Sequence, residues 1–163
     1  NSSERDAMQA INVPVDLAAL EAFKLTEKVV AKSLDAERVT KEIFSQVDLF
    51  LETLESFITD KKFTISAGEL SVSNEGPIPL TKLSSGEKQL LILFIEALLQ
   101  RRKPYIFLAD EPELSLHIAW QRNIISAICS INPNAQIIVA THSPEVAGKY
   151  SFAILDMEDI LHG

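Results

Sequence analysis

Apolar residues recur at helical spacing through the first third of the chain, from about Asp16 onward. One stripe repeats at steps of three and four, and three more apolar residues widen it: Ile43, Val47, Phe50, Leu54 and Phe57, flanked by Phe44, Leu51 and Ile58. Asp16 and Asp35 are the expected N-caps of two successive helices. The stripe is short and phenylalanine-rich for the seam of a coiled-coil arm. We therefore favour a packed helical segment over residues 1–60, with residues 1–15 irregular.

The hydrophobic period changes to two after residue 62. Alternating apolar positions on both sides of Gly68 predict a β-hairpin closed by Ala67-Gly68-Glu69: Phe63, Ile65 and Ala67, then Leu70 and Val72. Pro77 and Pro79 predict an extended connector over residues 78–80.

The remainder alternates strands with helices. Helices are expected at 86–100, 116–130 and 144–149, and strands at 105–109, 136–140 and 152–155. The strands are continuously apolar, as in Tyr105 to Leu108, which is typical of a parallel sheet buried on both faces. The predicted fold class over residues 61–163 is therefore α/β.

Composition narrows the functional classes. The chain has 163 residues, is 47% hydrophobic and carries a formal charge of −8. This acidic balance argues against autonomous nucleic-acid binding, which needs clustered Lys and Arg. The one basic run, residues 101–103, follows an apolar stretch and fits favourable charge at a helix C-terminus. That stretch, residues 90–99, contains Glu96 and is too short to span a membrane.

Cys129 is the single cysteine and stands among apolar residues. We expect it to behave as a buried small hydrophobe. No disulfide is possible within the chain, which favours a reducing, cytoplasmic location.

Three segments carry candidate chemistry. Leu83-Ser84-Ser85-Gly86-Glu87 opens a predicted helix, where the backbone N–H groups could bind a phosphate. A plain N-cap followed by favourable acid is the equal alternative. Asp110 and Glu111 end one buried strand, where Asp can hold Mg²⁺ and Glu can polarise a water. His142 follows the next strand and is expected at the same sheet edge.

Together these segments resemble ABC-type ATPases. Residues 83–89 are similar to the signature motif, residues 106–111 to the Walker B strand, 113–117 to the D-loop, and His142 to the switch histidine, in the family's order. Ser85, Glu87 and Glu113 differ from the usual transporter residues. The chain is most similar to the RecF, SMC and OLD-like (AAA_21-type) group of DNA-repair and phage-defence ATPases. His117 stands where the D-loop aspartate would be.

The resemblance implies a fold and a set of roles. The fold would be the C-terminal lobe of a P-loop NTPase head, preceded by a helical insertion and a β-hairpin. The cofactors would be ATP and Mg²⁺, with Asp110 and Glu111 at the metal and Glu111 and His142 catalytic. Ser84, Ser85, Gly86 and Ser115 would bind ATP across a homodimer in which two heads sandwich the nucleotides. A nuclease or effector partner is possible, as is nucleic acid in the full complex, and no membrane is expected.

The P-loop pattern Gly-x-x-x-x-Gly-Lys-Ser/Thr is absent from the sequence. In such heads it precedes the insertion, so we expect this chain, which starts at Asn1, to need an N-terminal half that carries the P-loop. Alone it should bind ATP weakly or not at all. Two alternatives stay open: the ATPase subunit of a transporter, and a lobe that binds an effector without catalysis.

Overall fold

The computed structural model describes residues 16–156, so the irregular structure expected for residues 1–15 lies outside the described part. The chain divides into two units, one up to Lys41 and one from Glu42 onward. Each is described by itself.

A single helix, α1 (Leu17–Phe57, 41 residues), begins in the first unit and ends in the second. Asp16 caps it as expected, because its Oδ1 accepts a hydrogen bond from the N–H of Ala18 at 3.0 Å. The prediction of a second helix starting at Asp35 is wrong. Asp35 lies inside α1, where its carboxylate pairs with Arg38 one turn later at 2.9 Å. No Gly or Pro occurs between residues 17 and 57 to end the helix.

The apolar side chains between residues 17 and 41 are exposed; they include Leu17, Phe23, Leu25, Val29 and Leu34. The packed helical segment that we favour for residues 1–60 stays a prediction.

The hydrophobic core lies in the second unit. The end of α1 contributes Phe50 and Leu54 to it, as the apolar stripe predicted, whereas Ile43 from the same stripe is 47% exposed. The ring of Phe57 meets that of Phe94 edge-on, with 5.3 Å between the ring centres. Later segments of the chain add further residues to the core: Ile58, Phe63, Val72, Leu90, Phe94, Phe107, Ile124 and Ile128.

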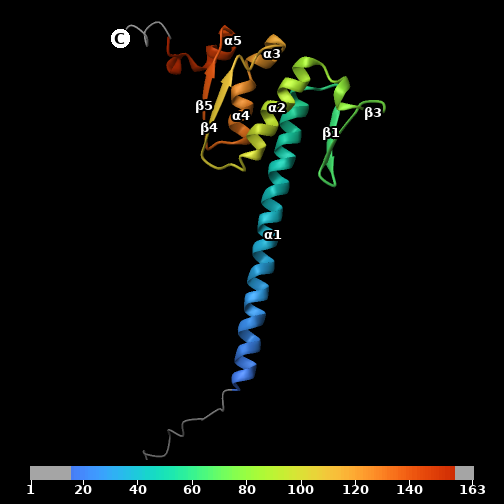
Figure 1. Cartoon of the computed structure of the whole chain (residues 1–163), viewed down its shortest axis with the longest axis vertical. Helices are drawn as coiled ribbons and strands as arrows, with labels where there is room; N and C mark the ends of the chain where they lie inside the picture. The colour runs from blue at the N-terminus through green and yellow to red at the C-terminus, as the bar shows by residue number, and fades with distance from the viewer. Residues whose placement is uncertain (1–15, 157–163) are drawn as a thin grey trace, which may run out of the picture. The chain divides into compact units, whose positions relative to one another are not determined.

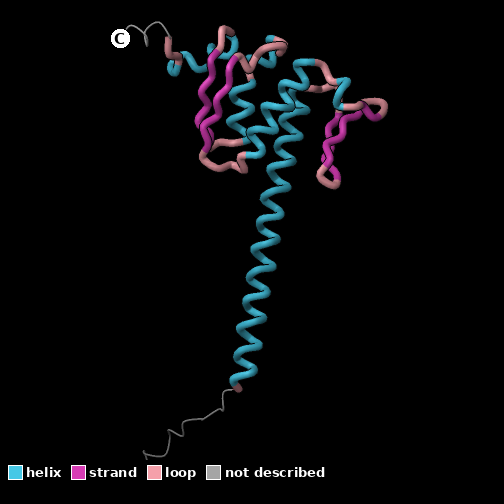
Figure 2. Tube along the Cα trace, in the orientation of Figure 1, coloured by secondary structure: helices cyan, strands magenta, loops and turns pink. Residues whose placement is uncertain are grey.

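The predicted hairpin is confirmed (Figure 2). Strand β1 (Lys62–Ser66) pairs antiparallel with β2 (Glu69–Ser73), with Ser66 opposite Glu69. The two linking residues, Ala67 and Gly68, have φ of 52° and 81°, the left-handed geometry that a two-residue hairpin turn requires. The expected connector differs in part. β3 (Pro77–Ile78) adds a short third strand to this sheet, and the 3₁₀ turn η1 (Leu80–Lys82) follows.

The parallel pair is also confirmed. β4 (Tyr105–Asp110) pairs with β5 (Ala135–Ala140), so that Asp110 lies opposite Ala140. Figure 1 shows α2 (Ser85–Leu99) and α4 (Ile124–Ile131) beside this pair. At the far end of the pair the buried Asn132 amide donates to the side chain of Gln100 at 2.6 Å and to the carbonyl of Lys103 at 3.1 Å. Asn132 therefore fixes the segments that enter both strands.

The single helix expected at 116–130 is in fact two. α3 (Ile118–Gln121) ends in a turn at residues 122–123 before α4 begins. The N–H of Asn123 bonds back three residues to Trp120, and the φ of Asn123 is −117°, outside the helical range. These two facts mark the break.

The predicted third strand at 152–155 is wrong. After α5 (Pro144–Ala147), residues Gly148–Ala153 form the 3₁₀ segment η2, and 154–156 have no regular structure. A strand needs a hydrogen-bonded neighbour. Within residues 16–156 the sheet contains β4 and β5 alone, and Phe152 is 86% exposed.

The expectation that the parallel sheet is buried on both faces is also wrong for the described residues. Phe107 faces the core, whereas Ile106, Leu108 and Ile138 point to the other face and are 57%, 70% and 49% exposed. Residues 16–156 therefore cover one face of the sheet. Cys129 is half-buried, less than predicted, and burial raises the pKa of its thiol.

Candidate functional site

The first candidate segment forms the start of α2. Ser84 is the N-cap, and its hydroxyl oxygen accepts from the N–H of Glu87 at 3.3 Å. The Glu87 carboxylate reaches back to the N–H of Ser84 at 2.7 Å, which completes a capping box. The predicted cap is therefore present, and it leaves Ser84 and Ser85 exposed at the helix N-terminus. An exposed helix N-terminus of this kind can still receive an anion.

Glu87 also anchors this helix to the segment after α1. Its second carboxylate oxygen lies 2.7 Å from the ammonium of Lys61, and the two side chains are 10% and 16% exposed. Desolvation raises the pKa of Glu87, but the hydrogen bonds from Lys61 and from Ser84 outweigh it, so the pKa lies below its usual value. The pKa of Lys61 is raised mainly by the hydrogen bond with Asp60 and next by the hydrogen bond with Glu87. No sequence pattern indicates this pair, because 26 residues separate its members.

We expect Glu87→Gln to lower the free energy of unfolding of the chain at pH 7 by about 1–3 kcal/mol, as for loss of a hydrogen-bonded charge. Glutamine can keep the capping box, so the loss isolates the ion pair. Because the pKa of Glu87 is depressed in the folded chain, its contribution is present above the unfolded pKa of about 4.3. It is lost as pH falls through the lower, folded pKa. Denaturant titrations should show the two proteins converging in stability at acid pH.

The matched control for that measurement is Asp35→Asn, which breaks an ion pair in which both side chains are about two-thirds exposed. We expect no resolvable change from it. Equal effects of the two substitutions would contradict the importance of the Lys61–Glu87 pair.

Gly86 and Ser115 join the signature-like segment to the loop after β4. A Cβ added at Gly86 would lie 2.5 Å from the carbonyl oxygen of Ser115, and Ser115 itself has a φ of 70°. Gly86 is buried, so its place in the sequence is explained by this close approach of two backbones. The two residues, both predicted to bind ATP, are neighbours within one chain.

We expect Gly86→Ala to destabilise the chain by about 1–3 kcal/mol, because the added methyl group meets a backbone atom that cannot rotate away. Gly148→Ala is the matched control, since Gly148 has helical φ and ψ and nothing lies within 4 Å of an added Cβ. Thermal unfolding of both variants tests the expectation. Equal stability of the two would contradict the close approach.

The second and third segments meet at the carboxyl ends of β4 and β5, which we call the carboxylate edge. Asp110 is exposed, and Glu111 has a φ of 46° and donates its N–H to the carbonyl of Ala140 at 2.8 Å. Nε2 of His142 lies 3.4 Å from Oε1 of Glu111, and the His142 side chain is 96% exposed. The predicted meeting of Glu111 and His142 is therefore present in the structure.

The carboxylate edge offers few ligands for a metal. Within residues 16–156, no group of three or more His, Cys, Asp or Glu side chains is placed to hold an ion. Asp110 and Glu111 alone fit a magnesium ion that keeps several waters and takes its other ligands from phosphates, as Mg²⁺ commonly does.

Side chains of the loop between β4 and α3 make hydrogen bonds within the chain that no sequence pattern indicated. His117 caps α3, with its Nδ1 accepting from the N–H of Ala119 at 3.3 Å. Glu113 is 5% exposed, and its carboxylate accepts a short hydrogen bond from the hydroxyl of Thr141. A buried glutamate is rare unless it is paired, but neither its spacing nor its neighbours in sequence indicated this one.

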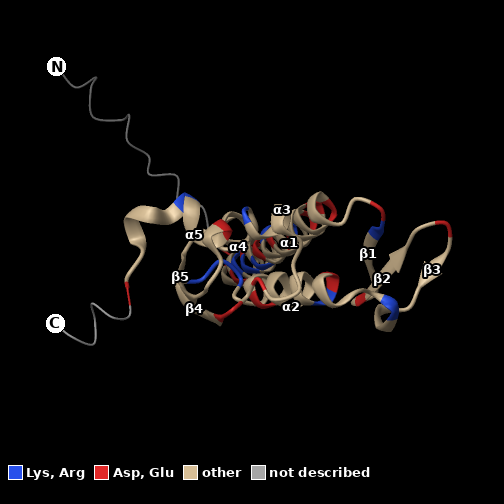
Figure 3. Ribbon diagram, turned by 90° about the horizontal axis from the view of Figure 1, so that it is seen from above, with Lys and Arg blue, Asp and Glu red and all other residues tan. Residues whose placement is uncertain are grey.

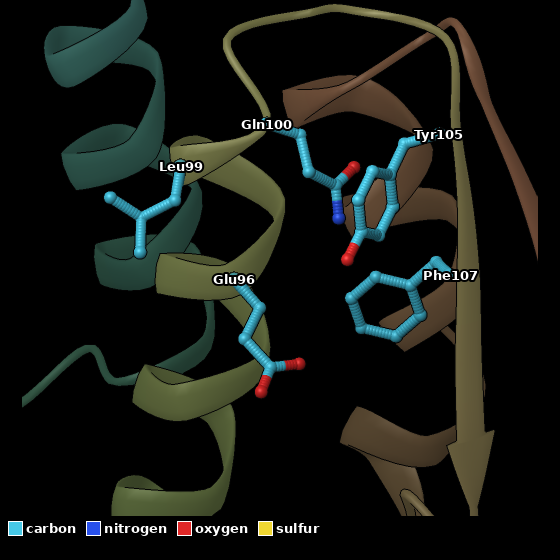
Figure 4. Close-up of a pocket in the computed structure, with 5 residues that line it drawn as sticks. All are labelled: Glu96, Leu99, Gln100, Tyr105 and Phe107. Carbon is cyan, nitrogen blue, oxygen red and sulfur yellow. The ribbon is translucent and has the colours of Figure 1, made fainter.

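One pocket of the second unit lies apart from the carboxylate edge. It is between α2 and β4 and is lined by Glu96, Leu99, Gln100, Tyr105 and Phe107. Figure 4 shows Gln100 and Tyr105 facing each other there, at the opposite end of β4 from Asp110.

Lys, Arg, Asp and Glu residues are scattered over the helices and strands (Figure 3). Over residues 16–156, no helix combines the length and apolar character needed to cross a membrane.

Comparison with protein families gives a match over most of the chain. Residues 11–148 match the family described as "AAA domain, putative AbiEii toxin, Type IV TA system".

Two bacterial proteins are similar to part of the chain. "Retron Ec83 probable ATPase" from Escherichia coli is 38% identical over an 86-residue alignment that covers 45% of this chain and 16% of that protein. "Retron Vc95 probable ATPase" from Vibrio cholerae serotype O1 biovar El Tor is 35% identical over an 86-residue alignment that covers 46% of this chain and 17% of that protein. The chain thus aligns with about a sixth of the length of these relatives.

Proposed function

The chain belongs to the AAA-domain family of P-loop ATPases that its residues 11–148 match, and from that premise we propose that it supplies the hydrolytic edge of a dimeric, ABC-type ATPase. The observation that carries the proposal is the pairing of Glu111 with His142 at the carboxyl ends of two parallel strands, 3.4 Å apart. Ligands of α/β sheets bind at such an edge. The family generally uses ATP and Mg²⁺.

Each residue of the carboxylate edge has a role in this proposal. Asp110 helps to hold the magnesium ion, and Glu111 accepts a proton from the attacking water. The hydrogen bond from the N–H of Glu111 to Ala140 fixes the backbone from which that carboxylate projects. His142 faces the γ-phosphate from the same head. The ion, when bound, neutralises charge that develops on the phosphates.

The start of α2 acts on the other nucleotide of the dimer in this proposal. Ser84 and Ser85 are exposed at a helix N-terminus, which suits contact with the γ-phosphate held by a second head. Gly86 and Ser115 lie against each other beneath them, so the signature-like segment and the D-loop would approach the partner as one surface.

The P-loop belongs, in this proposal, to a segment that packs on the open side of the sheet. The support is the exposed apolar face of β4 and β5, formed by Ile106, Leu108 and Ile138. Parallel sheets are almost always covered on both faces. The sequence also lacks the P-loop pattern. A DNA-repair or phage-defence setting, with a nuclease or effector partner, is part of this proposal and is supported by the resemblance alone.

Calorimetric titration with ATP and Mg²⁺ tests whether ATP binding needs the segment that carries the P-loop. We expect the 163-residue chain alone to bind ATP only at millimolar concentration or not at all, because the amides and lysine that hold the β-phosphate are missing. The complete protein should bind ATP and release phosphate. Micromolar affinity of the chain alone would contradict the proposal. A complete protein that binds ATP without hydrolysis would instead favour the effector-binding alternative.

A further inference from the structure

Glu113 joins the loop after β4 to the loop after β5. Thr141, which follows the last residue of β5, donates its hydroxyl to the Glu113 carboxylate. The oxygen of the same hydroxyl accepts from the N–H of Ser143 at 3.0 Å. Glu113 and Ser143 are thus held by one side chain, and the residue between Thr141 and Ser143 is His142.

The hydrogen bonds continue beyond Ser143 to a third segment. The Ser143 hydroxyl donates to the side chain of Gln121 at 2.8 Å and accepts from the N–H of Glu145 at 3.2 Å. The Gln121 amide in turn donates to the carbonyl of Leu116 at 3.0 Å. The chain of bonds therefore returns to the loop that contains Glu113, and both flanks of His142 are fixed while its ring is exposed to solvent beside Glu111.

The burial of Glu113 is costly for a residue that only fills space. Its side chain is 5% exposed, and its Oε2 is buried with no hydrogen-bond partner among residues 16–156. A buried carboxylate oxygen without a partner costs free energy that an apolar residue of the same size would avoid. Such a group calls for a role beyond packing.

We propose that Glu113 is a positioning residue: through Thr141 it holds the loop of His142 against the loop of Glu111, so that the two catalytic groups keep their separation. The proposal rests on the proposed function for its catalytic consequence. Its structural content, an ordered loop after β5, is independent of that function. Glu113 and Glu111 are two residues apart on one loop, so order imposed at Glu113 is passed to Glu111 directly.

The kinetic test uses the complete protein. We expect Glu113→Ala and Thr141→Val each to lower kcat about 10–100-fold, since misplacing a catalytic group by about 1 Å can cost that much. The KM for ATP should stay within about threefold, because the proposed function assigns neither side chain a contact with the nucleotide. The double variant should be no slower than the slower single variant, as for two residues that act as one unit. Thr141→Ser keeps the hydroxyl and should recover the parental kcat within about threefold.

Glu145→Gln is the control, since Glu145 pairs with Arg122 beside the same loop but outside the Glu113–Thr141 bond. It should leave kcat unchanged. Losses that multiply in the double variant, or an unchanged kcat in both single variants, would overturn the proposal. If Glu113→Ala does not fold, Thr141→Val, which keeps the side-chain volume, carries the same expectation.

A second measurement separates this proposal from the proposed function. In Glu113→Ala the amide hydrogens of Ser143 and Glu145 should exchange with solvent about tenfold faster, because the loop opens more often. The N–H of Asn134 is the internal reference, since it donates to the side chain two residues earlier, as that of Ser143 does, but at the other end of β5. Parental exchange at Ser143 would overturn the proposal even if hydrolysis were lost. A complete protein without ATPase activity would sink the proposed function, and the exchange rates would still decide the role of Glu113.

Discussion

Replacing Glu111 by glutamine in the complete protein will lower kcat for ATP hydrolysis about 10²–10⁴-fold while ATP still binds. The amide has the shape of the carboxylate but cannot accept a proton from water. Glu111 has a left-handed backbone fixed by the hydrogen bond to Ala140, so the substitution leaves the position of the side chain unchanged. Phosphate release gives kcat, and nucleotide titration gives the affinity. Dimers that form with ATP should accumulate, because hydrolysis no longer separates them.

Two results would contradict this assignment. Turnover of Glu111→Gln at the parental rate would show that another group activates the water. Loss of ATP binding in the same variant would place Glu111 in binding, not in proton transfer. Glu145→Gln, which removes a partly buried carboxylate paired with Arg122, should change neither quantity.

The second large effect is expected at Ser84. Ser84→Arg puts a bulky cation on the exposed N-cap of α2, where the helix dipole is positive and where the nucleotide of the second head would approach. We expect dimerisation and hydrolysis to fail together, with hydrolysis reduced about 100-fold or more, as for loss of an electrostatic donor in a transition state. Size-exclusion chromatography with ATP and phosphate release measure the two effects.

The capping box makes a matched control necessary for that experiment. Ser84→Arg also removes the hydroxyl that accepts from Glu87, a loss of about 1 kcal/mol of helix stability. Ser84→Ala removes the same hydroxyl without adding bulk or charge. If Ser84→Ala abolishes dimerisation as fully as Ser84→Arg does, loss of the hydroxyl explains the result, and the added bulk and charge do not.

A mixture of variants tests whether the two residues act across the dimer. Combining Ser84→Arg heads with Glu111→Gln heads produces mixed dimers in which one composite site has both parental residues and the other has neither. Partial activity in the mixture supports action from opposite heads. Background activity alone means that Ser84 and Glu111 serve one site from one chain.

The sequence pattern predicted those parts of the fold that depend on residues close together in the chain. Alternation around Gly68 predicted the hairpin, because the turn geometry and the register are fixed within a few residues. Continuous apolar runs predicted β4 and β5, and their polar ends predicted that Glu111 and His142 would meet. An N-cap at Ser84 followed by favourable acid was one of two equal alternatives for that segment, and the structure contains the cap as a capping box with Glu87.

Several of the errors and omissions depend on partners distant in the sequence. The apolar run at Phe152 resembled a strand, but no neighbouring strand is present within residues 16–156 to bond with it. Asp35 has the composition of an N-cap, yet the good helix formers on both sides continue α1 through it. The contact of Gly86 with Ser115 and the bond between Glu113 and Thr141 link segments 28–29 residues apart, and no periodicity records such contacts.

The order of the strands has a consequence for folding. β1 and β2 are joined by two residues, so the hairpin can close within about 1–10 μs. β4 and β5 are parallel and are joined through α3 and α4, so their pairing must wait until a much longer loop has closed. Glu111 and His142 follow these two strands and approach each other only when the strands pair. The carboxylate edge is therefore among the last parts of the chain to assemble, and a partly folded chain would contain the hairpin before Glu111 and His142 lie together.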